Sequence, residues 1–202
     1  MAKDFKRVLV NTSVSKFKEL DIKCYSTKCK DGLHCFSKKE ARKRDIEEGK
    51  CIDCGKTLID WERINQMDIS DIPYLVRSLE QELIRFGYWN SIIDQEARVK
   101  AKKRGKNALR ISAYKRVKSS IGGSDNYHEG WQTPYAGDNI INYGQHATGT
   151  CCRHCFEDWY NVPVGVDLNE KQLQFSTEMI MFYIERRIPD LQDEKLPTKK
   201  KP

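Results

Sequence analysis

The sequence contains no long apolar run, and its first residues, MAKDFKRVLVNTS, lack the apolar core of a secretory signal peptide. The longest unbroken apolar stretch, residues 179–184, has six members, whereas a membrane-spanning helix needs about 20. We therefore expect a cytoplasmic protein without a membrane anchor. Disulfides are rare in that compartment, so the eight cysteines are expected to be metal ligands or free thiols.

Acidic residues are absent from one stretch, residues 98–118, although the chain as a whole contains 29 of them. This stretch carries a charge of +10, so the rest of a chain with net charge +7 sums to −3. A basic field this concentrated favours nucleic acid as a partner, either DNA or RNA. The alternatives are a solvated helix face and a surface that docks an acidic protein within a larger assembly. The ten candidate phosphate-binding residues are Arg98, Lys100, Lys102, Lys103, Arg104, Lys106, Arg110, Lys115, Arg116 and Lys118.

Hydrophobic periodicity and capping residues divide the chain into segments. The apolar spacing over residues 72–86 predicts one amphipathic helix, and two basic helices are expected at 91–103 and 107–120, separated by Gly105. A short strand is expected at 140–143. Asn169 and Gln172 have capping-box spacing at the start of a helix over 170–187.

These segments predict an α+β fold with a mainly helical second part. The expected divisions are a flexible lead-in at 1–22, a small zinc-ribbon or treble-clef module at 23–62, a mainly helical basic domain with a short strand and a Cys/His cluster at 70–189, and a disordered basic tail at 190–202.

The first cysteine group consists of two pairs, Cys24 with Cys29 and Cys51 with Cys54, and Gly55 follows the last cysteine. Pairs at such spacings hold zinc in closed tetrahedral sites that stabilise small modules. We therefore expect one structural Zn²⁺ bound by these four thiolates. Two further residues, Cys35 and His34, could each replace one of the four, although Cys35 is also typical of a small buried apolar side chain.

The second cysteine group lies in the segment GQHATGTCCRHCF, residues 144–156. Its expected ligands are His146, Cys152 and Cys155, and Cys151, His128 or a water could supply a fourth. Three interpretations remain open. A second zinc could be structural; an open zinc site could activate water, as in a hydrolase or base deaminase; or Cys151 could be a nucleophile activated by His146.

The region around this second group resembles an uncharacterised bacterial domain family whose signature runs QTP, QHATxTCCRxC and then W. The resemblance covers about residues 85–188 and implies a bacterial or phage setting, but no particular activity. Tyr160 departs from the pattern, which has a histidine there. The matching positions are Gln132, Thr133, Pro134, Gln145, His146, Ala147, Thr148, Thr150, Cys151, Cys152, Arg153, Cys155 and Trp159.

The segment 122–139 is rich in Gly, Asn, Asp and Pro and is expected to form a long loop. It carries the aromatic residues Tyr127, Trp131 and Tyr135, which could stack on bases beside the basic helices. The sequence therefore predicts a zinc-stabilised nucleic-acid-binding protein. The competing hypotheses are a zinc-dependent hydrolase or deaminase acting on nucleic acid or nucleotides, and a scaffold subunit of a larger bacterial assembly.

Overall fold

The computed structural model describes residues 23–126, 131–134 and 137–193. The lead-in predicted at 1–22, the candidate ligand His128, the aromatic residues Tyr127 and Tyr135 and the tail beyond residue 193 lie outside these ranges. Within them the helices are α2 (Lys38–Lys43), α3 (Trp61–Asn65), α4 (Ile72–Leu79), α5 (Leu83–Asn90), α6 (Gln95–Val117), α7 (Ile140–Ala147), α8 (Arg153–Tyr160) and α9 (Glu170–Arg187), with short 3₁₀ turns at Cys29–Asp31, Ile69–Asp71 and Ser124–Asn126 and a π turn at Lys118–Gly122.

The described part of the chain is helical and contains no strand, which corrects the α+β prediction. Its only β-type pairings there are two isolated bridges, one between Lys28 and Leu33 and one between His34 and Glu82. The strand expected at 140–143 is the start of helix α7. Asn139 caps that helix by accepting a hydrogen bond from the Ile141 N–H at 3.1 Å. A short apolar run does not distinguish a strand from a helix. Here the capping bond to Asn139 favours the helix.

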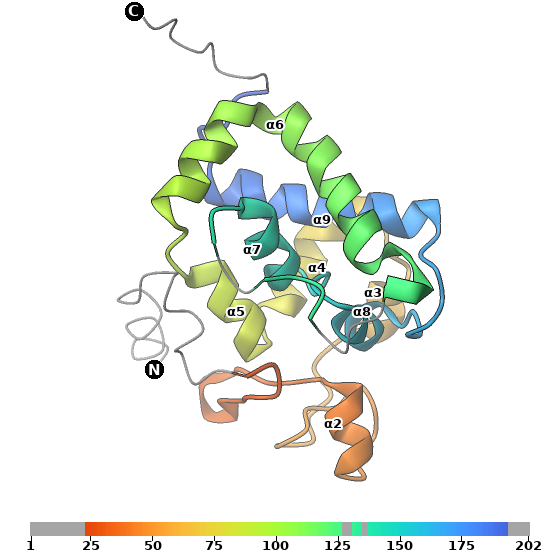
Figure 1. Ribbon diagram of the computed structural model, residues 1–202. Helices are drawn as coiled ribbons and strands as arrows, with labels where there is room; N and C mark the ends of the chain where they lie inside the picture. Colours follow the sequence, from red (N-terminus) through yellow and green to blue (C-terminus); the bar gives the residue numbers. More distant parts are fainter. Residues whose placement is uncertain (1–22, 127–130, 135–136, 194–202) are drawn as a thin grey trace, which may run out of the picture.

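Helix α6 is bent at Gly105, as the sequence predicts. Gly105 has φ 76° and ψ 166°, a conformation that glycine adopts without the steric cost of a Cβ. The N–H groups that follow the bend are bonded by the C-terminal segment, since Lys106 donates to the Gln192 carbonyl at 2.9 Å and Asn107 to that of Asp193 at 3.1 Å. Figure 1 shows the two arms of α6 arching over α7 and α9.

The single helix expected at 72–86 is divided into α4 and α5. The cause is tertiary, because the N-terminal module pairs with the backbone at the break. The His34 N–H donates to the Gln81 carbonyl at 2.8 Å, and the Leu83 N–H donates to the His34 carbonyl at 3.0 Å. The side chain of Glu82 turns inward at this point and is 3% exposed.

Helix α9 follows its prediction and forms the centre of the core. The capping box is present, with the Gln172 N–H donating to Asn169 Oδ1 at 3.0 Å and the Asn169 N–H donating to Gln172 Oε1 at 2.9 Å. The helix packs on both α6 and α7. Gly144 of α7 lies against α9 so closely that a Cβ there would be 2.9 Å from Ile180 Cγ2.

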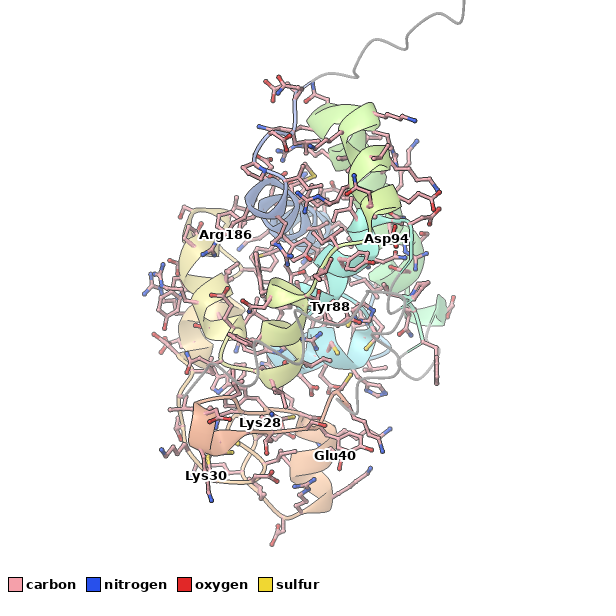
Figure 2. The ribbon with its side chains drawn as sticks, turned by 90° about the vertical axis from the view of Figure 1, so that its left-hand side faces the viewer. Lys28, Lys30, Glu40, Tyr88, Asp94 and Arg186 are labelled. Carbon is pink, nitrogen blue, oxygen red and sulfur yellow. The ribbon has the colours of Figure 1, made fainter. Side chains whose placement is uncertain are left out.

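The N-terminal module packs onto the helical part through aromatic residues. Phe36 makes edge contacts with Trp61 and Trp159, at centroid distances of 5.6 and 6.0 Å. Figure 2 shows the module, marked by Lys28, Lys30 and Glu40, beneath the part that carries Tyr88, Asp94 and Arg186. Among the described helices, none combines the length and apolar character needed to cross a bilayer.

Candidate metal centres and basic surface

Cys29, His34, Cys51 and Cys54 form the first centre, and their ligand atoms all lie within 4.8 Å of one another. The Cys29 and Cys51 sulfurs are 3.6 Å apart, and the Cys54 sulfur lies 3.4 Å from His34 Nδ1. A tetrahedral zinc with bonds of about 2.3 Å to sulfur and about 2.0 Å to nitrogen sets edges of about 3.8 Å between sulfurs and about 3.5 Å between sulfur and nitrogen. The four side chains therefore surround a space that fits one such ion.

The turn from Cys51 to Cys54 prepares a thiolate. Gly55, with φ 69°, closes it by donating its N–H to the Cys51 carbonyl at 2.9 Å. Burial acts to raise the pKa of the Cys51 thiol, but hydrogen bonds from the backbones of Cys35, Cys54 and Asp53 outweigh it and hold that pKa below its ordinary value. A thiolate is the form that binds metal.

The other groups of the first centre complete a cation-binding arrangement. Burial, together with the nearby sulfurs of Cys51 and Cys54, raises the pKa of Cys29 to about 12, because several thiolates repel one another without a cation between them. Burial, and then the charge of Lys56, lowers the pKa of His34. The imidazole is thus held neutral, which is its metal-binding form.

This ligand set differs from the first prediction at one position, because His34 stands where Cys24 was expected. The substitution was one of the alternatives that the sequence left open. Cys35 is fully buried with Ala41 and Ile52 in a small apolar cluster, and burial raises the pKa of its thiol far above the ordinary value. It is therefore a small core residue and not a member of the first centre.

Cys151, Cys152 and Cys155 form the second centre, with their sulfurs within 4.8 Å of one another. Cys152 caps α8, and its sulfur accepts a hydrogen bond from the Cys155 N–H at 3.5 Å. Hydrogen bonds from Cys151, Cys152 and Cys24, followed by the positive charge of Arg85, place the pKa of Cys155 well below its ordinary value. Each of the three clustered residues is 5% exposed or less.

A buried arginine that the sequence analysis did not identify faces this centre. Arg85 donates to the Cys155 sulfur at 2.9 Å, to the Cys151 sulfur at 3.6 Å and to the His146 carbonyl at 2.6 Å. Its Nε bonds to Glu82 at 3.0 Å, which in turn accepts from the Trp159 indole at 2.9 Å. The available signal was two charged residues, Glu82 and Arg85, on the expected buried side of an amphipathic helix.

His146 does not join the sulfurs of Cys152 and Cys155, so the structure does not assemble the ligand set expected there. Its Nε2 lies 3.1 Å from the Pro134 carbonyl oxygen, and its ring stacks on Tyr88 with centroids 4.6 Å apart. Burial, and then the positive charge of Arg85, lowers its pKa to about 4. The neutral ring is consistent with a packing role at this position.

The remaining motif residues form a buried polar network that holds the loop against the helices. Gln145, fully buried, accepts from Thr133 at 3.0 Å and donates to Ser120 at 3.1 Å and to the Thr150 carbonyl at 3.0 Å. Arg153 donates to the carbonyls of Ile121, Pro163 and Val166. Tyr160, the position that departs from the signature, donates to the Thr148 carbonyl at 2.5 Å.

The ten basic residues of 98–118 lie along α6 and the turn that follows it, but several are neutralised by acids from distant segments. Four form ion pairs: Lys100 with Glu96 and Asp138, Lys102 with Asp190, Lys106 with Glu185 and Asp193, and Arg110 with Glu178 and Glu185. The exposed residues Lys103, Lys115 and Lys118 form no ion pair with any residue that the structure describes. The local charge is therefore well below the +10 of the sequence.

One aromatic side chain is conspicuously exposed beside this helix. Trp131 is 78% exposed, and the next residue, Gln132, accepts a hydrogen bond from Arg116 through its carbonyl at 2.6 Å. A separate cleft of about 400 Å³ lies at the bend of α6, lined in part by Lys100, Lys103 and Arg104. The loop residue Trp131 thus presents a solvent-facing indole next to a residue that is bonded to the C-terminal arm of α6.

Comparison with known proteins finds a family match that contains the motif between the loop and α8. No solved structure matches this chain. A family model described as Domain of unknown function (DUF4186) matches residues 74–185, from α4 almost to the end of α9, and the first metal centre precedes this range. Because the match covers more than half of the sequence, Cys151, Cys152 and Cys155 included, the chain belongs to the DUF4186 family.

Proposed function

We propose that this protein binds nucleic acid through the C-terminal arm of α6, and that zinc at its two centres stabilises the fold. The observation that carries the proposal is the exposed indole of Trp131, tethered to the basic helix by the bond between Arg116 and the Gln132 carbonyl. An exposed aromatic ring near basic side chains is the arrangement that stacks bases while phosphates are neutralised.

The unpaired lysines set the expected strength of the interaction. Lys115 precedes Arg116 on this arm and Lys118 begins the π turn that follows it, whereas Lys100, Lys102, Lys106 and Arg110 are engaged with acids. Two exposed lysines contacting single-stranded phosphates give a slope of log affinity against log salt of about −1.4, whereas ten contacts would give about −7. We therefore infer modest, salt-sensitive binding with little sequence preference, and stacking favours single strands.

The metal centres support this surface and do not belong to it. The sulfurs of the second centre are buried, since Cys151, Cys152 and Cys155 are each 5% exposed or less. A hydrolytic or deaminating zinc needs an open position that substrate can reach. Structural zinc is therefore the better assignment for both centres.

The test is fluorescence anisotropy with labelled single-stranded DNA, single-stranded RNA and duplex DNA over a series of salt concentrations. We expect binding to single strands that weakens with salt at the shallow slope given above. Trp131→Ala should lower affinity by about 1–3 kcal/mol, the value of one base–aromatic stack. Tyr25→Ala serves as the matched control, because Tyr25 is also an exposed aromatic residue but lies on the N-terminal module.

The lysines are tested in the same assay. Lys115→Glu with Lys118→Glu should lower affinity and flatten the salt slope, whereas Lys39→Glu, a charge reversal on α2, should do neither. Absence of binding to every nucleic acid at low salt would refute the proposal. The basic face would then be assigned to an acidic protein partner, as in a scaffold subunit.

A further inference from the structure

We infer that Cys24 is the fourth ligand of the second metal centre, which becomes a Cys₄ site formed by Cys24, Cys151, Cys152 and Cys155. One ion would then join the start of the N-terminal module to helix α8. The inference requires metal at the second centre, as proposed above, and is independent of nucleic-acid binding.

The position of the Cys24 side chain is the first line of support. Its thiol lies close enough to the Cys155 sulfur to interact with it, and the sulfurs of Cys151 and Cys152 lie within 4.8 Å of that same atom. Three thiols thus converge on one sulfur, and the three come from two segments more than 120 residues apart in the sequence. Cys24 is separated from the first centre, whose four positions are filled by Cys29 and three other residues.

The backbone of residue 24 is held in place for this contact. The Cys35 thiol donates to the Cys24 carbonyl at 3.3 Å, and the Ser26 N–H closes a turn onto the Lys23 carbonyl at 3.0 Å. Cys24 and Cys29, five positions apart, therefore point to different centres. The pair that looks like one chelating unit in the sequence is divided between two ions.

The second centre needs a further ligand to be complete. Three sulfurs, from Cys151, Cys152 and Cys155, occupy three corners of a tetrahedron, and structural zinc takes four protein ligands. The Cys24 sulfur does not lie within 4.8 Å of all three, so binding would draw it closer to Cys151 and Cys152. Residue 24 is exposed, so this adjustment displaces no core side chain.

The charge of the surroundings fits four thiolates. Zinc with four thiolates carries a net charge of −2, which is costly to bury without compensation. The Arg85 guanidinium, itself 2% exposed, donates to Cys151 and Cys155 and offsets part of that charge. Donors of this kind next to a metal site also orient the ligands.

The first experiment uses the unmodified protein, purified with zinc and with its metal content measured. Each cysteine is labelled with iodoacetamide, and labelling rates are read by peptide mass spectrometry before and after addition of a chelator. We expect Cys24, although exposed, to be protected with zinc and to react rapidly without it, in parallel with Cys151, Cys152 and Cys155. Rapid labelling of Cys24 in protein that holds two zinc ions would overturn the inference.

The second experiment assigns Cys24 to one of the two centres by competition with a chromophoric chelator. Cys24→Ser should lower the affinity for one of the two zinc ions by about 100-fold or more. Replacing a residue that only supports the ligands typically lowers metal affinity by about 10- to 100-fold. The effect should persist in a Cys54→Ser background and vanish in a Cys155→Ser background. Tyr25→Ser is the matched control and should leave both affinities unchanged. The reverse dependence on the two backgrounds would place Cys24 in the first centre and refute the inference.

Metal content separates the possible failures. Protein that binds one zinc ion, with Cys151, Cys152 and Cys155 all reactive, would refute the second zinc and with it this inference, but would leave the nucleic-acid proposal standing. A disulfide between any two of these cysteines in freshly purified protein would have the same consequence.

Discussion

At the scale of single residues, the most unusual feature is a buried ion pair that faces sulfur. Arg85 and Glu82 are 2% and 3% exposed, and burial, with a smaller contribution from Cys155, raises the pKa of Glu82 even against the opposing charge of Arg85. Such a pair is retained only where each charge has further partners. Here the partners are the Trp159 indole, the Phe36 N–H and the cysteines of the second centre.

Replacing this arginine should therefore be severely destabilising. Arg85→Met leaves Glu82 without a counter-charge and removes two hydrogen bonds to cysteine sulfurs, so we expect the free energy of unfolding to fall by about 3–5 kcal/mol. Urea denaturation of zinc-loaded protein measures this change. Arg63→Met, which breaks an exposed ion pair with Asp71, is the control and should have little effect. Equal losses in the two variants would contradict this account of Arg85.

The residue types of the motif cysteines and histidines do not by themselves show which of them are metal ligands. His146 and Cys151 lie five residues apart, and either could be a ligand by type. The structure groups Cys151 with the other sulfurs and places His146 against Tyr88 and the Pro134 carbonyl. The direction in which each side chain leaves the backbone decides which of the two lies with the other sulfurs, and sequence spacing does not specify that direction.

At the scale of elements, α7 and α9 pack at unusually short range. The contact occurs at Gly144, where a Cβ would lie 2.9 Å from Ile180 Cγ2 and 3.4 Å from Tyr183 Cδ1. Both partner residues are fully buried, so neither can move without disturbing the core.

Gly144→Ala should accordingly lower stability although alanine favours helix. We expect a loss of about 1–3 kcal/mol from overpacking, partly offset by about 1 kcal/mol of helix propensity. Thermal or urea unfolding measures it. Gly122→Ala is the matched control, since its Cβ would meet nothing closer than 3.5 Å. A Gly144→Ala variant as stable as the wild type would show that α7 and α9 can separate at low cost.

Helices with strong local signals were predicted well, and those shaped by distant contacts were not. The limits of α9 and the bend of α6 follow from a capping box and from one glycine, both of which act within a few residues. The break between α4 and α5 depends on hydrogen bonds from His34, some 50 residues away. No local pattern contains that information.

At the scale of the whole molecule, the small N-terminal module depends on metal more than the helical part does. Few of its residues, among them Leu33, Phe36 and Ile59, belong to the main core, whereas α4 to α9 supply most of it. A module with so little apolar content gains much of its stability from bound zinc.

Removal of zinc should therefore unfold the N-terminal module before the helical part. The first centre includes the exposed Cys54 and the half-buried Cys29, whereas three of the four cysteines proposed for the second are buried. A chelator should therefore extract the ion of the first centre first, and amides in residues 28–60 should then exchange rapidly while those of α6 and α9 remain protected. Hydrogen exchange read by mass spectrometry during chelation measures this order. Simultaneous loss of protection throughout the chain would contradict the expected independence of the helical core.

The sequence by itself determined the family, the presence of two cysteine groups, the basic segment and the helices with strong caps, because each is written in residue types a few positions apart. Only the tertiary structure decided which residues share a centre, with His34 in the first and Cys151 in place of His146 in the second. It also showed that much of the positive charge on α6 is neutralised by acids from α9 and the chain beyond it. These properties depend on distances between segments that are remote along the chain, and those distances are set by how the helices pack.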